Sequence, residues 1–260
     1  MFQPVIPTTG YAGWRFLQRT IEVQQEAFSK SATLQRDKEH FQAQIGNIET
    51  ADDLVSDRRL MRVALGAFGL DEDINNRFFI KKILSDGTSD PDALSNRLAD
   101  KRYHQFSKSV GLADAPVGRP AITRQADAIW QMFEERQFDR AVGEVDNNLR
   151  LALNTEREIA SIRKQQSTNT GQWFAVIGTP PLREVFEKAF GLPQGIRSID
   201  IDRQENIFEE RAQKLFGSRD FDTFTSPEAQ EKLIHLFLLR TEVSQMAIAN
   251  GAQVALTLLS

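Results

Sequence analysis

The chain has 260 residues, a net charge of -4 and no cysteine. Its hydrophobic share of 40% and its 18 Phe are typical of a globular protein with a substantial, Phe-rich core. The lack of cysteine excludes disulfides, thiol catalysis and cysteine metal sites. The densest basic cluster, Arg58, Arg59 and Arg62, lies between acidic runs at 52–57 and 71–73, which argues against nucleic acid as a partner.

The distribution of apolar residues argues against membrane insertion. No run approaches the roughly 20 apolar residues that span a bilayer. The start MFQPVIPTTGYAGWRF has no basic region followed by an apolar core, as a cleaved signal peptide would. We therefore expect a cytoplasmic protein, or one exported by a non-classical route.

The first part of the chain indicates a flexible arm followed by helices. Residues 1–13 contain Pro4, Pro7 and Gly10 and show no periodic pattern, which indicates an extended or mobile arm. Over residues 14–48, apolar residues recur at helical spacing, which predicts one long helix or two.

Helix start and stop signals divide the next stretch. Thr50, followed by Asp52 and Asp53, is a predicted N-cap, and Gly69 suits the left-handed position after a helix over residues 58–68. Asp90 with Pro91 predicts a further helix start. Between these signals a third apolar stripe predicts a helix, with the members Ile74, Phe78, Phe79, Ile83 and Leu84.

The second part of the chain follows a linker. Residues 114–120, DAPVGRP, combine two prolines and a glycine. Residues 122–162 then predict one or two long helices, whereas the apolar stretch 173–177 is too short to assign by periodicity. Thr179 with Pro180, and Ser226 with Pro227, predict two further helix starts, the second before a long C-terminal helix.

Two segments of the chain resemble each other. Residues 60–70, LMRVALGAFGL, and 182–192, LREVFEKAFGL, agree at six of eleven positions, and DPDA at 90–93 parallels SPEA at 226–229. A duplicated helical unit explains this agreement, although Ala-Phe-Gly-Leu at a helix end is also a common solution to capping.

We therefore predict an all-α helical bundle with two related, pseudo-repeated halves. The first half covers residues 1–113, including the flexible arm 1–13. The linker covers 114–120, and the second half covers 121–260, packed on the first as one body.

Two stretches carry a family resemblance. DRRLMRVALGAFGLDEDI at 57–74 and FIKKILSDGTSDPDALSNRLADKRYHQFSKSVG at 79–111 resemble a bacterial family of unknown function found among alphaproteobacterial flagellar proteins. The resemblance implies an α-helical fold, a role in motility or assembly, and no enzyme activity. It covers most of the first half, and the second half only through the weaker repeat, where residues 180–183 read PPLR in place of DRRL.

No residue pattern indicates catalytic, cofactor or metal sites. The histidines have no ligand partner at zinc-site spacing, and residues 66–69 lack the spacing and the lysine of a phosphate loop. Residues 71–76, DEDINN, loosely resemble a calcium loop but lack its central glycine and its terminal glutamate. The acidic pairs, Glu134 with Glu135 and Glu209 with Glu210, are typical of solvated helix faces. The three histidines are His40, His104 and His235. We therefore expect no catalytic residue, no cofactor and no metal.

Interaction features remain. The arm carries Phe2, Val5 and Ile6, and the C-terminal end 247–260, AIANGAQVALTLLS, is small and apolar. That end packs either on the protein's own N-terminal helix or on a partner. We predict a non-enzymatic structural or assembly protein that binds protein partners, flagellar components being those that the resemblance implies. The alternatives are a ligand-binding or enzymatic helical protein without a recognisable motif, and an exported axial component whose termini fold on neighbours.

Overall fold

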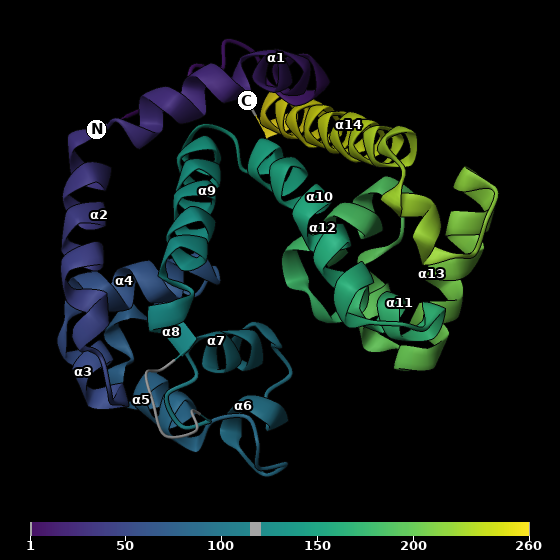
Figure 1. Cartoon of the computed structure of the whole chain (residues 1–260). Helices are drawn as coiled ribbons and strands as arrows, with labels where there is room; N and C mark the ends of the chain where they lie inside the picture. The colour runs from purple at the N-terminus through teal and green to yellow at the C-terminus, as the bar shows by residue number, and fades with distance from the viewer. Residues whose placement is uncertain (1, 115–120, 260) are drawn as a thin grey trace. The chain divides into compact units, whose positions relative to one another are not determined.

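The computed structural model describes residues 2–114 and 121–259, with side chains described as far as residue 246. Over these residues the protein is all-α, with fourteen α-helices, four short 3₁₀ helices and no strand (Figure 1). The predicted fold class is confirmed at this level. Of the expected linker 114–120, all but Asp114 lies outside the described residues.

The chain divides by its internal contacts into two compact units. Unit 1 comprises Met1–Pro4 and Thr20–Ala141, and unit 2 comprises Val5–Arg19 and Val142–Ser260. The division thus falls after residue 141 and not at 114–120. The reason is packing, because Trp130 and Phe133 belong to the same buried cluster as Phe41.

Unit 1 contains eight α-helices besides the second part of α1 (Gly10–Ser29), and the last of them ends in unit 2. The helices are α2 (Ala32–Gln44), α3 (Ala51–Ser56), α4 (Arg58–Ala67), α5 (Arg77–Asp86), α6 (Leu94–Arg97), α7 (Arg102–Val110), α8 (Ala121–Arg124) and α9 (Ala126–Val145), with 3₁₀ helices η1 (Ile45–Asn47) and η2 (Asp71–Asn75).

Local capping fixes the boundaries around α4. The Thr50 hydroxyl accepts the Asp53 N–H, and the Asp53 carboxylate accepts the Thr50 N–H at 2.7 Å, so the predicted cap of α3 is confirmed. Gly69, two residues after the end of α4, has φ +68°. The Leu70 N–H bonds the Leu65 carbonyl, and the Arg102 guanidinium donates to the Gly69 carbonyl at 2.6 Å.

Two expectations for unit 1 are wrong. No helix begins at Asp90 and Pro91, because the Asp90 side chain instead accepts the Asp92 N–H within a turn, and α6 starts only at Leu94. Phe78 does not join the core: it is 91% exposed, whereas Ile80 and Ile83 are buried. Phe78 and Phe79 are adjacent on a helix and point about 100° apart, so only one of them can face inward.

Unit 2 contains the first part of α1 and the remaining helices. They are α10 (Asn147–Gln165), α11 (Asn169–Gly178), α12 (Pro180–Phe190), α13 (Ile201–Phe216) and α14 (Pro227–Leu259), with 3₁₀ helices η3 (Gln194–Ser198) and η4 (Phe221–Thr225). The predicted starts of α12 and α14 are confirmed, and the unassigned stretch 173–177 is helical.

Aromatic rings fill the core of unit 2. The buried Trp173 lies 5.5–6.4 Å, centroid to centroid, from five phenylalanine rings, three of them in edge-on geometry with interplanar angles above 80°. The five are Phe186, Phe190, Phe208, Phe221 and Phe224. This ring cluster joins α11, α12, α13 and η4.

A buried carboxylate ties α12 to η3. Glu187 pairs with Arg183 at 2.6 Å and with Arg197 at 2.6 Å. Burial alone would raise the pKa of Glu187, but the hydrogen bonds and charges of Arg197 and Arg183 outweigh it and lower the pKa. The carboxylate is therefore charged in the folded unit.

We expect Glu187→Gln to lower the free energy of unfolding by about 1–3 kcal/mol near pH 7, because two arginines lose their anion. A lowered folded pKa stabilises the fold above the unfolded pKa of about 4.3, and this contribution disappears as the pH falls through the folded pKa. The difference between variant and wild type should therefore shrink as the pH falls below the unfolded pKa, which urea denaturation at neutral and at acidic pH would measure.

Glu184→Gln is the matched control, since Glu184 forms a half-exposed pair with Lys188 at 2.7 Å on the same helix. It should cost less than about 0.5 kcal/mol. Equal losses in the two variants would contradict the role of Glu187.

Candidate functional site

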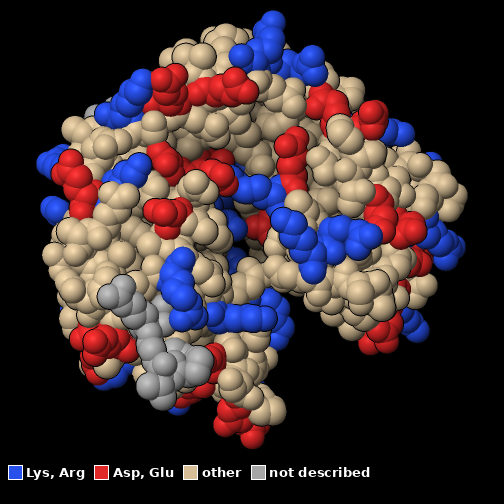
Figure 2. All heavy atoms as spheres, viewed as in Figure 1, with Lys and Arg blue, Asp and Glu red and all other residues tan. Residues whose placement is uncertain are grey.

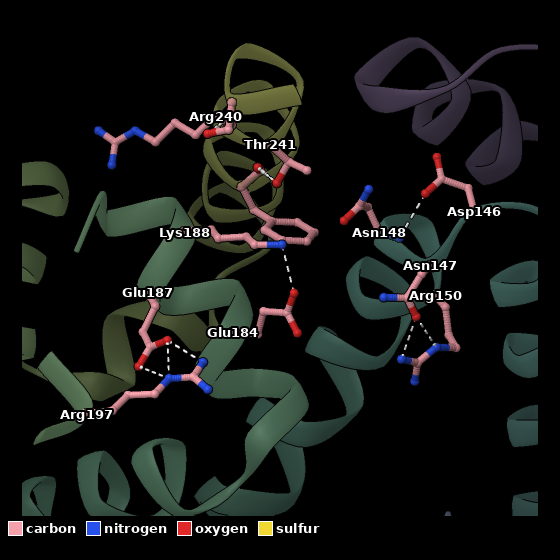
Figure 3. Close-up of polar contacts among 12 residues, drawn as sticks. Asp146, Asn147, Asn148, Arg150, Glu184, Glu187, Lys188, Arg197, Arg240 and Thr241 are labelled. Carbon is pink, nitrogen blue, oxygen red and sulfur yellow. Dashed lines mark hydrogen bonds and ion pairs between the residues drawn. The ribbon is translucent and has the colours of Figure 1, made fainter. Parts of the chain in front are cut away.

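The helix α14 is held on one side by α12. Ile234, Phe237 and Leu238 of α14 are buried, and α12 is the element that α14 contacts most extensively. The Arg240 guanidinium donates to the Ala189 carbonyl at 2.7 Å, at the end of α12. Figure 3 shows Lys188 directed at Glu184, and its ammonium lies 5.7 Å from the centroid of the Phe237 ring.

The end of α12 requires a glycine at this contact. Gly191 has φ +64°, and a Cβ there would lie 2.6 Å from the Arg240 guanidinium. The Leu192 N–H bonds the Glu187 carbonyl and completes the helix end. The close approach of Arg240 fixes α14 along α12.

The first part of α1 holds a second side of α14. Glu231 accepts hydrogen bonds from Tyr11 at 2.7 Å and from Trp14, Arg15 and Gln18 at 3.3 Å each. Burial alone would raise the pKa of Glu231, but these donors outweigh it and lower the pKa. One carboxylate thus joins the first and the last helix of the chain.

A third side of α14 is open. Leu239, Val243 and Met246 are 44%, 59% and 65% exposed. Their spacing of four and three residues puts them on one helix face, and we call them the open stripe. The sequence contains no charged residue after Glu242. The expected docking segment 247–260 lies outside the residues whose side chains are described.

Unit 1 contains a groove between α1 and α9. Its cavity of about 290 Å³ is lined from α1 by Gln25, Glu26, Phe28 and Ser29, and from α9 by Gln131, Glu134, Glu135 and Phe138. The Phe28 and Phe138 rings form an edge-on pair at 5.8 Å, and Phe2 packs on Phe28 at 5.3 Å. We call this feature the α1–α9 groove.

The charge of the α1–α9 groove is negative. Its lining includes the carboxylates of Glu26, Glu134 and Glu135, and no lysine or arginine. Glu26 pairs with Lys30 at 2.5 Å. On the face drawn in Figure 2, by contrast, acidic and basic side chains are both spread among uncharged residues. The α1–α9 groove is therefore lined by both aromatic and acidic side chains.

The histidines have separate partners. His40 lies 2.7 Å from the Asp57 carboxylate, and His104 lies 2.7 Å from the Asn96 side chain. The His235 ring packs on Tyr11 at 4.3 Å. Burial, with Lys108 and Lys101 nearby, lowers the pKa of His104. In the ranges that the structure describes, no three His, Asp or Glu side chains gather in a way that could hold a metal ion.

The acidic motifs are engaged in structural contacts. In the stretch 71–76, Asp71 accepts from Gln137 at 2.7 Å, and Asp73 accepts from the Tyr103 hydroxyl at 2.6 Å. Glu209 does not share a solvated face with Glu210: burial and the neighbouring Glu205 raise the pKa of Glu209.

No helix within the described residues is long and apolar enough to cross a bilayer.

Sequence reasoning missed the α1–α9 groove and the exposure of Phe78. The acids Glu134 and Glu135 appear in the sequence only as a charged pair, and Phe28 appears only as one member of a long stripe. The arm residues separate, since Phe2 packs in unit 1 and Val5 belongs to unit 2. The α1–α9 groove and the separation of the arm residues both depend on contacts between segments that are distant in the sequence.

Comparison with known proteins gives a family and a structural relative. The profile of a family described as "Protein of unknown function (DUF1217)" matches residues 67–229. A solved structure, protein AGR_C_984 from Agrobacterium tumefaciens, is 27% identical with a TM-score of 0.73, covering 93% of this chain and 97% of that chain. No curated protein matches.

We expect Glu231→Ala to loosen α1 from α14, because four donors lose their common acceptor. The free energy of unfolding should fall by about 1–3 kcal/mol. Amide hydrogen exchange should accelerate over residues 10–19 in particular. The control is Glu228→Ala, one turn earlier on the exposed surface of α14, which should leave that exchange unchanged. Unchanged exchange in both variants would contradict the anchoring role.

Proposed function

Because this chain belongs to the family described as proteins of unknown function (DUF1217), we propose a function from its own surfaces. It is a non-enzymatic structural or assembly protein that acts through helical protein–protein contacts. Its partner is a helix with an uncharged apolar face, which binds α14.

The observation that carries this proposal is the open stripe. Leu239, Val243 and Met246 are exposed on a helix whose other sides are fixed by α12 and by α1. A spacing of four and three residues is the spacing of helix–helix seams. Since the stripe carries no charge, a partner that buries it must be apolar there.

An association with flagella is the more specific part of the proposal. It is supported by the resemblance of residues 57–74 and 79–111 to a family found among flagellar proteins, and by a structural relative in an alphaproteobacterium. The protein then acts in the cytoplasm or follows the flagellar export route.

We also propose that the two units arose by duplication of one helical unit. Three features support it: the N-cap positions of α4 and α12 are Asp57 and Thr179, a glycine with positive φ follows both helices, and an arginine from a later helix donates to a backbone carbonyl near each helix end. An alignment of relatives tests it. Positions 57–70 and 179–192 should vary in parallel, and unrelated variation would leave only convergent capping.

We expect Val243→Glu to weaken partner binding strongly without unfolding the protein, because it adds a charge to an exposed apolar stripe. Loss of a central contact of about 2 kcal/mol weakens binding roughly thirtyfold. The measurement is recovery of flagellar components, identified by mass spectrometry, with tagged full-length protein from its native cells.

The matched control is Gln245→Glu, which adds the same charge at an exposed polar position of α14. Recovery should be lost with Val243→Glu and kept with Gln245→Glu. Equal recovery with both variants would exclude the open stripe as the docking site, and no flagellar component with wild type would exclude the flagellar association.

A further inference from the structure

Phe78 is an aromatic side chain with almost no contact to its own chain. It is 91% exposed near the start of α5, and its neighbour Arg77 is exposed as well. Arg77 has no carboxylate partner among the residues that the structure describes, whereas Lys81 pairs with Asp52 and Lys82 with Asp86. Burying such a ring removes roughly 150–250 Å² of apolar surface from water, which favours an aromatic partner site.

The α1–α9 groove has the complementary chemistry. Its cavity of about 290 Å³ is just below the range of about 300–1,000 Å³ typical of small-molecule sites, so a single large side chain suits it. The half-buried Phe28 ring offers an aromatic surface beside Phe138. Glu134, half-buried in the lining, has no cation partner within the described part of the chain.

We propose that a second copy of this chain inserts Phe78 into the α1–α9 groove and places Arg77 against Glu134. Aromatic packing on Phe28 supplies the apolar part of the contact. The pairing of Arg77 with Glu134 supplies charge complementarity, which fixes orientation and opposes other partners. The inference goes beyond the proposed function and does not depend on α14.

Phe78 and the groove are different patches of one unit, so two copies can exchange Phe78 reciprocally or join head to tail. A reciprocal exchange stops at a dimer. In a head-to-tail arrangement, each copy that donates Phe78 keeps its own groove open for another copy, which produces rings or filaments. In both arrangements association should rise with the protein concentration.

Sedimentation velocity of the full-length chain over a concentration series tests the proposal. Wild type should self-associate, and Phe78→Ala, Arg77→Glu and Glu134→Arg should each weaken association by about tenfold or more. The double variant R77E/E134R restores the ion pair in reversed form and should regain most of the association. A purely structural role of either residue would not produce this rescue.

Glu22→Arg is the matched control: it reverses an exposed charge on α1 outside the groove and should leave association unchanged. Circular dichroism should show all variants folded, since Phe78, Arg77 and Glu22 are exposed and Glu134 is only half-buried. A wild-type chain that stays monomeric overturns the proposal. A double variant no better than the single variants also overturns it.

A second measurement uses the absence of cysteine from the chain. The variant Arg77→Cys is mixed with a variant chain of different molecular mass, so that cross-linked pairs can be told apart. Under oxidation it should cross-link to Glu134→Cys and should not cross-link to Ser244→Cys, which is exposed in unit 2. Equal cross-linking to both positions overturns the proposed contact.

Discussion

The carboxylate of Glu231 joins the beginning of the chain to its end. Four side chains from the first part of α1 donate to it, and α14 is thereby held between α1 and α12. Unit 2 is therefore complete only when residues 5–19 reach it, although most of its sequence lies more than a hundred residues later. This constraint limits the sides of α14 that remain for a partner, and among its described side chains the apolar Leu239, Val243 and Met246 are exposed.

The expectations from sequence that hold are those that depend on neighbouring residues. Helix ends depend on residues within a few positions, so the sequence predicts them. Examples are the Thr50 cap, the glycines after α4 and α12, and the prolines at the starts of α12 and α14. Asp90 shows the limit of such signals, since its side chain caps a turn as readily as a helix.

Contacts between distant segments could not be predicted from the sequence. Trp130 lies beyond the apparent linker 114–120, yet it packs on Phe41, with ring centroids 6.1 Å apart. A run of proline and glycine marks a break in secondary structure and carries no information about which core the next helix joins. Phe78 is the converse case: the apolar pattern counts it as core, while the adjacent Phe79 takes the inward position beside Tyr103, with ring centroids 5.3 Å apart.

The two proposed surfaces belong to different units, with Phe78 and the α1–α9 groove in unit 1 and the open stripe in unit 2. Self-association through unit 1 would repeat the open stripe once per copy. An assembly of copies would then bind a repeating helical partner at several points, and each further contact would form at high effective concentration. Individually weak contacts are sufficient for such an assembly, which fits a stripe of only three described apolar side chains.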